Sequence, residues 1–299
     1  MQETLEQQDF PAQLGEEPEK PDIWWVETAR MFYANKAAVL GLAGLMIITF
    51  VGLFGPVLFR ADPFEIVAPP LTKPGGVTCL GTDYLGRDVF IGLIYGARPT
   101  LAIAVTATAF TVFIGMSIGA VAGFYGGQMD NLLMRITEFF QVLPPLVLAM
   151  VIVGVFTPNF LTVIFAIAVV SWTGLARLTR AEFLKLKERE FVMAARAVGA
   201  RNNRLIIRVI LPNALPPLII AVTLRIGITI IYEAALSFLG LTDPDIMTWG
   251  KMIGLSRDFF FEAWWTVTFP GLAILITALC IALIGDGLND AFNPKLRGR

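Results

Sequence analysis

The chain lacks histidine altogether and has only two cysteines, so the side chains that most often bind metals or act as general bases are nearly missing. Cys79 and Cys280 lie far apart and form no metal-binding spacing; two unpaired thiols are favoured over the alternative of a disulfide between them. No Gly-x-x-x-x-Gly-Lys-Ser/Thr phosphate-binding loop occurs, so any ATP that drives this protein must bind to another chain. We therefore expect no catalytic residue, no metal and no cofactor in this chain.

Charged residues are also scarce in this chain. They make up 16% of the 299 residues, whereas hydrophobic residues make up 56% and the mean hydropathy is +0.70. A soluble domain carries about a quarter charged residues, and a net charge of -1 argues against nucleic acid as a partner. The composition predicts an all-α polytopic membrane protein, because a helix satisfies all of its own backbone polar groups in lipid.

Long apolar runs predict six transmembrane helices, since about 20 such residues cross the hydrocarbon core. They cover residues 37–59, 100–124, 132–156, 160–175, 214–236 and 266–288. Pro144 and Pro145 lie inside the third run and should kink it. Gly115, Gly119 and Gly123 recur every four residues in the second run, a spacing that favours close helix packing over chance.

The polar segments divide the chain into regions. Residues 1–36 are expected to form an acidic cytoplasmic tail and an interfacial helix, and residues 37–59 the first transmembrane helix. Residues 60–99 form an external segment, 100–290 the main transmembrane domain with a loop at about 177–212, and 291–299 a second cytoplasmic tail. Trp249, Trp264 and Trp265 are expected as anchors at the membrane interface.

The distribution of lysine and arginine predicts the orientation. The segments assigned to the cytoplasm hold 16 of these 23 residues, the external segments hold six, and Arg225 lies inside the fifth run. Because cytoplasmic segments are enriched in positive charge, both termini are expected in the cytoplasm. Nine of the 16 belong to the loop at 177–212: Arg177, Arg180, Lys185, Lys187, Arg189, Arg196, Arg201, Arg204 and Arg208.

Two charged residues lie in the fifth run, where each charge costs on the order of 3 kcal/mol in lipid. Arg225 either contacts backbone carbonyls or a neighbouring subunit, or it faces a watery path across the membrane. Glu233 lies nearer the outer end and is expected to be structural. Eight residues separate the two, roughly 12 Å along a helix, which is too far for direct pairing.

The basic loop has the pattern of two short helices. One face of the first helix carries small and apolar residues: Phe191, Ala194, Ala195 and Val198. Gly199 is a natural stop for this helix, and a second amphipathic helix is predicted from Arg201 until Pro212 redirects the chain into the membrane. The loop either presents a compact helix to a cytoplasmic partner or lies on anionic lipid.

The segments FVMAARAVGA at 191–200 and VILP at 209–212 resemble the EAA loop of ATP-binding-cassette importer permeases. The pattern of that loop is Glu-Ala-Ala, three residues, Gly, nine residues and Ile-x-Leu-Pro. Five residues match it: Ala194, Ala195, Gly199, Leu211 and Pro212. Met193 stands where the pattern has Glu, and Glu190, one turn earlier, is the candidate to replace it. The resemblance implies that these seven residues couple an ATPase to transport.

Further segments resemble the C-type subunit of dipeptide and oligopeptide importers: LGTDYLGRDVF at 80–90, IYGAR at 94–98, LKEREF at 186–191, EAALSFLGL at 233–241 and LIGDGLNDAFNPK at 283–295. The resemblance implies a permease, not an enzyme, in the bacterial inner membrane, with residues 60–99 in the periplasm. It implies a second permease, two ATPase subunits, an extracytoplasmic substrate-binding protein and membrane lipid as partners. Peptides are the implied substrate, with nickel chelates or oligosaccharides as alternative substrates. An ATP-independent secondary transporter is the alternative class of protein.

Overall fold

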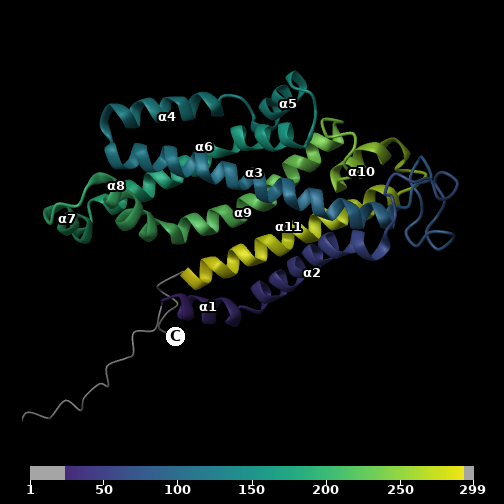
Figure 1. Ribbon diagram of the computed structural model, residues 1–299, viewed down its shortest axis with the longest axis horizontal. Helices are drawn as coiled ribbons and strands as arrows, with labels where there is room; N and C mark the ends of the chain where they lie inside the picture. The colour runs from purple at the N-terminus through teal and green to yellow at the C-terminus, as the bar shows by residue number, and fades with distance from the viewer. Residues whose placement is uncertain (1–23, 293–299) are drawn as a thin grey trace, which may run out of the picture.

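The computed structural model describes residues 24–292, which fold into helices (Figure 1). Their bounds are α1 Trp24–Ala34, α2 Lys36–Phe59, α3 Val89–Tyr125, α4 Gly127–Gln141, α5 Pro145–Val155, α6 Phe160–Lys187, α7 Glu190–Ala197, α8 Asn202–Arg204, η1 Leu205–Ile210, α9 Leu211–Phe238, α10 Trp249–Ser256, η2 Arg257–Phe259 and α11 Trp265–Phe292. These residues contain no strand, which confirms the all-α class. The acidic tail predicted at residues 1–22 and most of the tail at 291–299 lie outside the described residues.

Five helices are long and apolar enough to cross a membrane: α2, α3, α6, the continuous helix Asn202–Phe238 and α11. α4 and α5 meet at an angle of 81° and, counted as one broken span, supply the sixth. The count of six agrees with the prediction, but the third span is broken rather than kinked. Pro145 lacks the N–H that a continuous helix needs, and it keeps the residue before it, Pro144, out of the helical conformation (φ -54°, ψ 130°).

Two helices extend beyond their apolar runs. α3 begins at Val89 rather than at residue 100, because the side chain of Asp88 accepts a hydrogen bond from Phe90 N (2.8 Å) and caps the helix. α6 continues past residue 175 to Lys187, because its apolar stripe extends to Phe183, which is fully buried. The external segment therefore ends near residue 88 rather than 99, and the loop predicted at 177–212 is largely helical.

The predicted change of direction at Pro212 is wrong. Residues 202–238 form one continuous helix, in which Leu205–Ile210 adopt π-helical spacing just before the proline. Leu211 N–H donates to Ile206 O, five residues earlier in the chain. This local widening accommodates a proline that has no N–H to donate, so the chain enters the fifth span without a corner.

The helices form an elongated bundle, shown in Figure 1 with its long axis horizontal. α2 and α11 pack side by side along one edge, and α4 and α5 lie along the opposite edge. The segment between α2 and α3 lies with α10 at one end of the bundle, whereas α7 lies at the other. α1 and the last turns of α11 are at the same end as α7, so the described ends of the chain share one side.

Candidate coupling loop and transport path

The predicted coupling loop folds as α7, an eight-residue helix held between the ends of α6 and η1. A Schellman motif ends it, because Ala200 N–H donates to Ala195 O (3.1 Å) and Gly199 N–H donates to Arg196 O (2.9 Å). Gly199 has φ +85°, in the left-handed region that glycine adopts without a steric penalty. The helix therefore ends where the sequence predicts.

One side of α7 is anchored and the other is free. Val192 is fully buried in an apolar cluster that α6 and η1 complete, and Ala195 is half-buried against the same cluster. Among the exposed residues of α7 and its C-cap are four that we call the knob: Phe191, Met193, Ala194 and Val198. The most exposed of the three large side chains in the knob is Val198, which is 90% exposed. The loop thus presents a small apolar surface whose orientation is fixed by the buried side of the same helix.

The other coupling candidates lie close to α7 in the chain. Glu190 is exposed in the first turn of α7. Leu211 and Pro212 begin α9, separated from α7 by α8 and η1; Leu211 packs on the cluster that holds Val192, and Pro212 is exposed. Four arginines lie in or just after the knob in the chain, and in the described part of the chain they form no ion pair: Arg196, Arg201, Arg204 and Arg208.

An ion pair that the sequence did not indicate ties the broken span to α6. Arg180 donates from Nε to Asp130 Oδ1 (2.5 Å) and from its terminal nitrogen to Asp130 Oδ2 (2.6 Å). Such a two-point contact fixes angle as well as distance. Asp130 lies in the first turn of α4, so the pair joins the start of α4 to the C-terminal half of α6.

The predicted glycine face of α3 lies against α6 of the same chain. A Cβ added at Gly115 would lie 2.9 Å from Trp172 O, and one at Gly123 would lie 2.6 Å from the Cβ of Phe183. At Gly119 the added atom would overlap Ala176 O and lie 2.6 Å from the Cβ of Thr179. The backbones of α3 and α6 therefore touch along this face, as small-residue packing in membranes allows.

Arg225 and Glu233, the charged residues of α9, have different surroundings. Arg225 is half-buried, and one of its terminal nitrogens lies over Gly174 of α6, where an added Cβ would approach to 3.0 Å. Within residues 24–292 no carboxylate pairs with it. Glu233 is fully buried, and its Oε1 accepts a hydrogen bond from Ser237 Oγ (2.7 Å). Ser237 also contacts Thr248, the N-cap of α10, so Glu233 helps to join α9 to the external loop.

The end of the bundle opposite α7 is organised around Lys251 of α10. Its Nζ donates to the carbonyl oxygens of Asp243 (3.2 Å), Pro244 and Ile246 (3.2 Å), and it lies 5.1 Å from the centre of the Phe64 ring. Burial lowers the pKa of the Lys251 ammonium below its ordinary value, and nearby Arg87 acts in the same direction. One buried cation thus gathers the 243–246 loop over α10.

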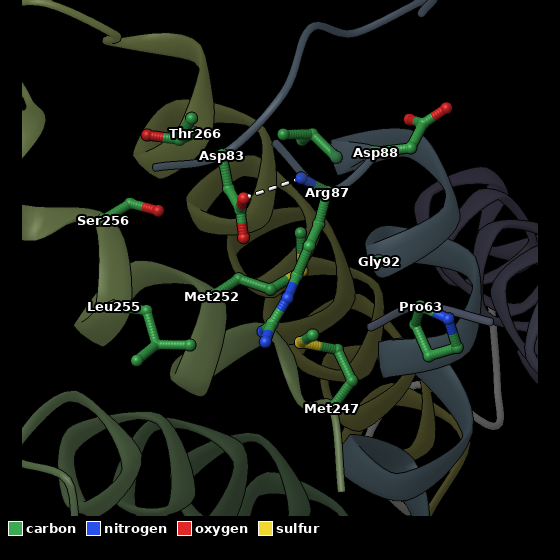
Figure 2. A pocket seen from close by; sticks show the side chains of 11 residues that line it. Pro63, Asp83, Arg87, Asp88, Gly92, Met247, Met252, Leu255, Ser256 and Thr266 are labelled. Atoms are coloured by element: carbon green, nitrogen blue, oxygen red, sulfur yellow. Dashed lines mark hydrogen bonds between the residues drawn. The ribbon is translucent and has the colours of Figure 1, made fainter. Parts of the chain in front are cut away.

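The pocket in Figure 2 lies between α10 and the segment that joins α2 to α3. In it Arg87 N–H donates to Asp83 Oδ1 (2.9 Å), drawn as the dashed line. Its volume is about 10 Å³, the room that one water molecule needs. Met247 and Met252 line it, so this pocket is a packed joint rather than a substrate site.

Two of the three tryptophans expected at the membrane interface belong to the core instead. Trp249 is 3% exposed and donates from Nε1 to Leu93 O (2.8 Å), and Trp265 is 2% exposed and donates to Thr82 O (3.2 Å). Trp264 is 51% exposed, in keeping with an interfacial position. The indole N–H groups of Trp249 and Trp265 donate to carbonyl oxygens of α3 and of the segment between α2 and α3. These hydrogen bonds join residues far apart in the chain, so the sequence alone does not predict them.

Comparison with protein families gives two matches. The family described as "Binding-protein-dependent transport system inner membrane component" matches residues 115–298, and "N-terminal TM domain of oligopeptide transport permease C" matches residues 24–72. The first match covers α7 and both helices that hold it. The second covers α1, α2 and part of the external segment.

Curated relatives are similar along nearly their whole length. The di/tripeptide transport system permease protein DppC of Pseudomonas aeruginosa is 40% identical, over 89% of this chain and 90% of the relative. The oligopeptide transport system permease protein OppC of Bacillus subtilis is 34% identical, over 91% and 90%. Among solved structures, an inward-facing MetNI methionine ABC transporter shares the fold, with a TM-score of 0.56 and 20% identity over 68% of this chain and 97% of that chain.

Proposed function

We propose a transport function on the premise that this chain belongs to the family of binding-protein-dependent transport system inner membrane components, and within it to the dipeptide and oligopeptide permeases. It is a permease subunit, a transport component rather than an enzyme. Its role is to form the membrane path for short peptides in an ATP-driven importer. The full-length similarity to peptide permeases carries this proposal and favours it over nickel chelates, oligosaccharides or an ion-driven transporter.

The proposed assembly contains a second permease, two ATPase subunits and an extracytoplasmic substrate-binding protein. The knob of α7 supports ATPase docking, because an exposed apolar surface that is rigidly held is a typical contact for another protein. The binding protein delivers peptide at the opposite end, where Lys251 holds the external loop over α10. In this orientation both termini lie in the cytoplasm of a bacterial inner membrane.

The proposed coupling runs from the knob into the spans. An ATPase that moves the knob also moves α6 and α9, because the buried side of α7 packs on both through one cluster. The Asp130–Arg180 ion pair extends this movement to α4. The permease pair alternates between inward-open and outward-open states, and ATP shifts the balance between them. Arg225 is the proposed contact for a peptide carboxylate in the path, since it is half-buried and unpaired within the described chain.

The test is purification in mild detergent followed by reconstitution into vesicles. We expect the second permease and the ATPase subunits to co-purify, and uptake of a labelled dipeptide to require both ATP and the binding protein. A non-hydrolysable ATP analogue is the matched control and should abolish uptake. Uptake by this chain alone, driven only by an ion gradient, would contradict the importer assignment, and uptake of a nickel chelate or an oligosaccharide without peptide uptake would contradict the substrate class.

A further inference from the structure

A cleft of about 560 Å³ lies between α2, α3, α9 and α11. Its lining is almost entirely aliphatic, with Leu42, Leu45 and Leu53 on α2 facing Val105 on α3 and Ile226 on α9. Leu53 and Val105 at its rim are each 54% exposed, so the cleft is open at the surface of the chain. Its volume falls within the roughly 300–1,000 Å³ range of sites that hold small molecules.

Two of the three threonines in the lining, Thr106 and Thr223, form hydrogen bonds with their own helices. Thr106 Oγ1 donates to Ala102 O (2.6 Å), and Thr223 Oγ1 donates to Ile219 O (2.9 Å). A peptide brings amide groups that need partners, and burying them unpaired is costly. A hydrocarbon chain brings none. The chemistry of the lining therefore fits an acyl chain better than it fits a peptide.

A single cation lies at the mouth of this cleft. Arg98 lines both the cleft and an adjoining, more polar pocket on the external side, and its side chain is exposed. Within the described chain it forms no ion pair; Asp245, which lines the far side of the polar pocket, is not paired with it. Placing an arginine charge at the edge of hydrocarbon costs free energy unless an anion pairs with it. The planar guanidinium group can donate two parallel hydrogen bonds to the oxygens of a phosphate.

The cleft is long enough to hold most of one acyl chain. Leu42 and Leu53 are eleven residues apart on α2, roughly 16 Å along a helix, and one leaflet contributes about half of the 30 Å hydrocarbon core. Arg98 lies at the end of the cleft nearer α10 and the external segment. We propose that the cleft binds a phospholipid of the external leaflet, with one acyl chain between α2 and α3 and the phosphate on Arg98.

The test uses the complete transporter in vesicles of phosphatidylethanolamine and phosphatidylglycerol. Two photoactivatable probes carry the same diazirine-labelled acyl chain, one as phosphatidylglycerol and the other as diacylglycerol without phosphate. We expect the phospholipid probe to label peptides that contain Val105 and Ile226, and to do so more than diacylglycerol does. Arg98→Gln should lower the phospholipid labelling about tenfold, the effect of losing one charge-assisted contact.

Two variants complete the design. Arg60→Gln, at the external end of α2 and outside the cleft, is the matched arginine control and should leave labelling unchanged. Ala102→Trp should lower the labelling by both probes, because the new side chain fills the mouth of the cleft. Equal labelling by the two probes with no effect of Arg98→Gln would overturn the proposal. Absence of labelling in the unmodified transporter would also overturn it, since a helix of a partner subunit would then fill the cleft.

Discussion

Glycine has two separate roles at the residue scale in this chain. At Gly119 the backbone and side chains of α6 occupy the space that a side chain would need, whereas the backbone itself is ordinary helix. At Gly199 no atom lies within 4 Å of an added Cβ, but φ is +85°. The first glycine is therefore required for packing and the second for backbone conformation, and the two requirements predict different mutational profiles.

Gly119→Leu should prevent α3 from reaching α6. We expect a loss of at least about 3 kcal/mol in stability, because the added side chain meets helix backbone that cannot give way. The measurement is the yield and thermal stability of the folded transporter by fluorescence size-exclusion chromatography. Gly271→Leu in α11, where an added Cβ meets no atom within 4 Å, is the control. Equal stability of the two variants would show that the α3–α6 contact tolerates a side chain.

Substitutions at Gly199 should follow tolerance of the left-handed conformation rather than size. Gly199→Val is expected to cost about 1–2 kcal/mol, because a β-branched residue is disfavoured at positive φ, whereas Gly199→Asn should cost much less. Gly199→Val should insert normally and lose transport through weaker ATPase association, because the end of α7 is distorted. The measurement is the ATPase retained on purification, with membrane levels checked by immunoblot. Equal retention for the Val and Asn variants would contradict the conformational argument.

α7 illustrates the element scale, because its anchored and free sides perform separate tasks. Val192 fixes the helix to α6 and η1, whereas the knob has no partner among the described residues. Ala195 lies between these sides, half-buried against the anchoring cluster. A bulky charge at Ala195 therefore disturbs the chain's own packing as well as any partner contact, while Ala194 is exposed and reports on the partner alone.

Ala194→Arg should leave insertion and folding unchanged but weaken ATPase association and abolish most peptide uptake. Ala195→Arg should lose transport too, with an added loss of thermal stability of about 1–3 kcal/mol from overpacking the cluster. Ala29→Arg, an exposed position in α1 away from α7, is the control for added charge and should behave like the parent. Full uptake with a bound ATPase in the Ala194→Arg variant would mean that the knob lies on lipid instead.

At the scale of the whole molecule, α7 lies at one end of the elongated bundle, and α10 lies at the other end, which we propose to be external (Figure 1). Lys251 and Glu233 hold the external end together, and the Asp130–Arg180 pair ties α4 to α6 toward the other end. Arg225 lies between these fixed ends on α9 and has no such structural partner in the described chain. Of the two charged residues of α9, Arg225 is therefore the one that we propose as the contact for a peptide carboxylate.

Arg225→Gln should leave assembly intact and lower the uptake of a dipeptide about tenfold per ATP hydrolysed, because one charge-assisted contact with the peptide carboxylate is lost. Uptake of the same dipeptide with an amidated C-terminus should change little. Arg60→Gln provides the comparison for loss of an arginine outside the path. An equal drop for both peptides, accompanied by lower thermal stability, would assign Arg225 a structural role instead.

The sequence by itself determined which segments enter the membrane and where the coupling helix ends. Both depend on local properties: apolar runs long enough for hydrocarbon, and a glycine at a position that needs positive φ. The tertiary structure decided the partners. Three features join residues that are far apart in the chain: the Asp130–Arg180 pair, the burial of Trp249 and Trp265, and the cleft beside Arg98. A local sequence pattern does not predict which distant residues come into contact. Packing also extended α6 beyond its apolar run, because Phe183 is buried against neighbouring helices. The early start of α3 depends instead on the local cap by Asp88, which hydropathy does not detect.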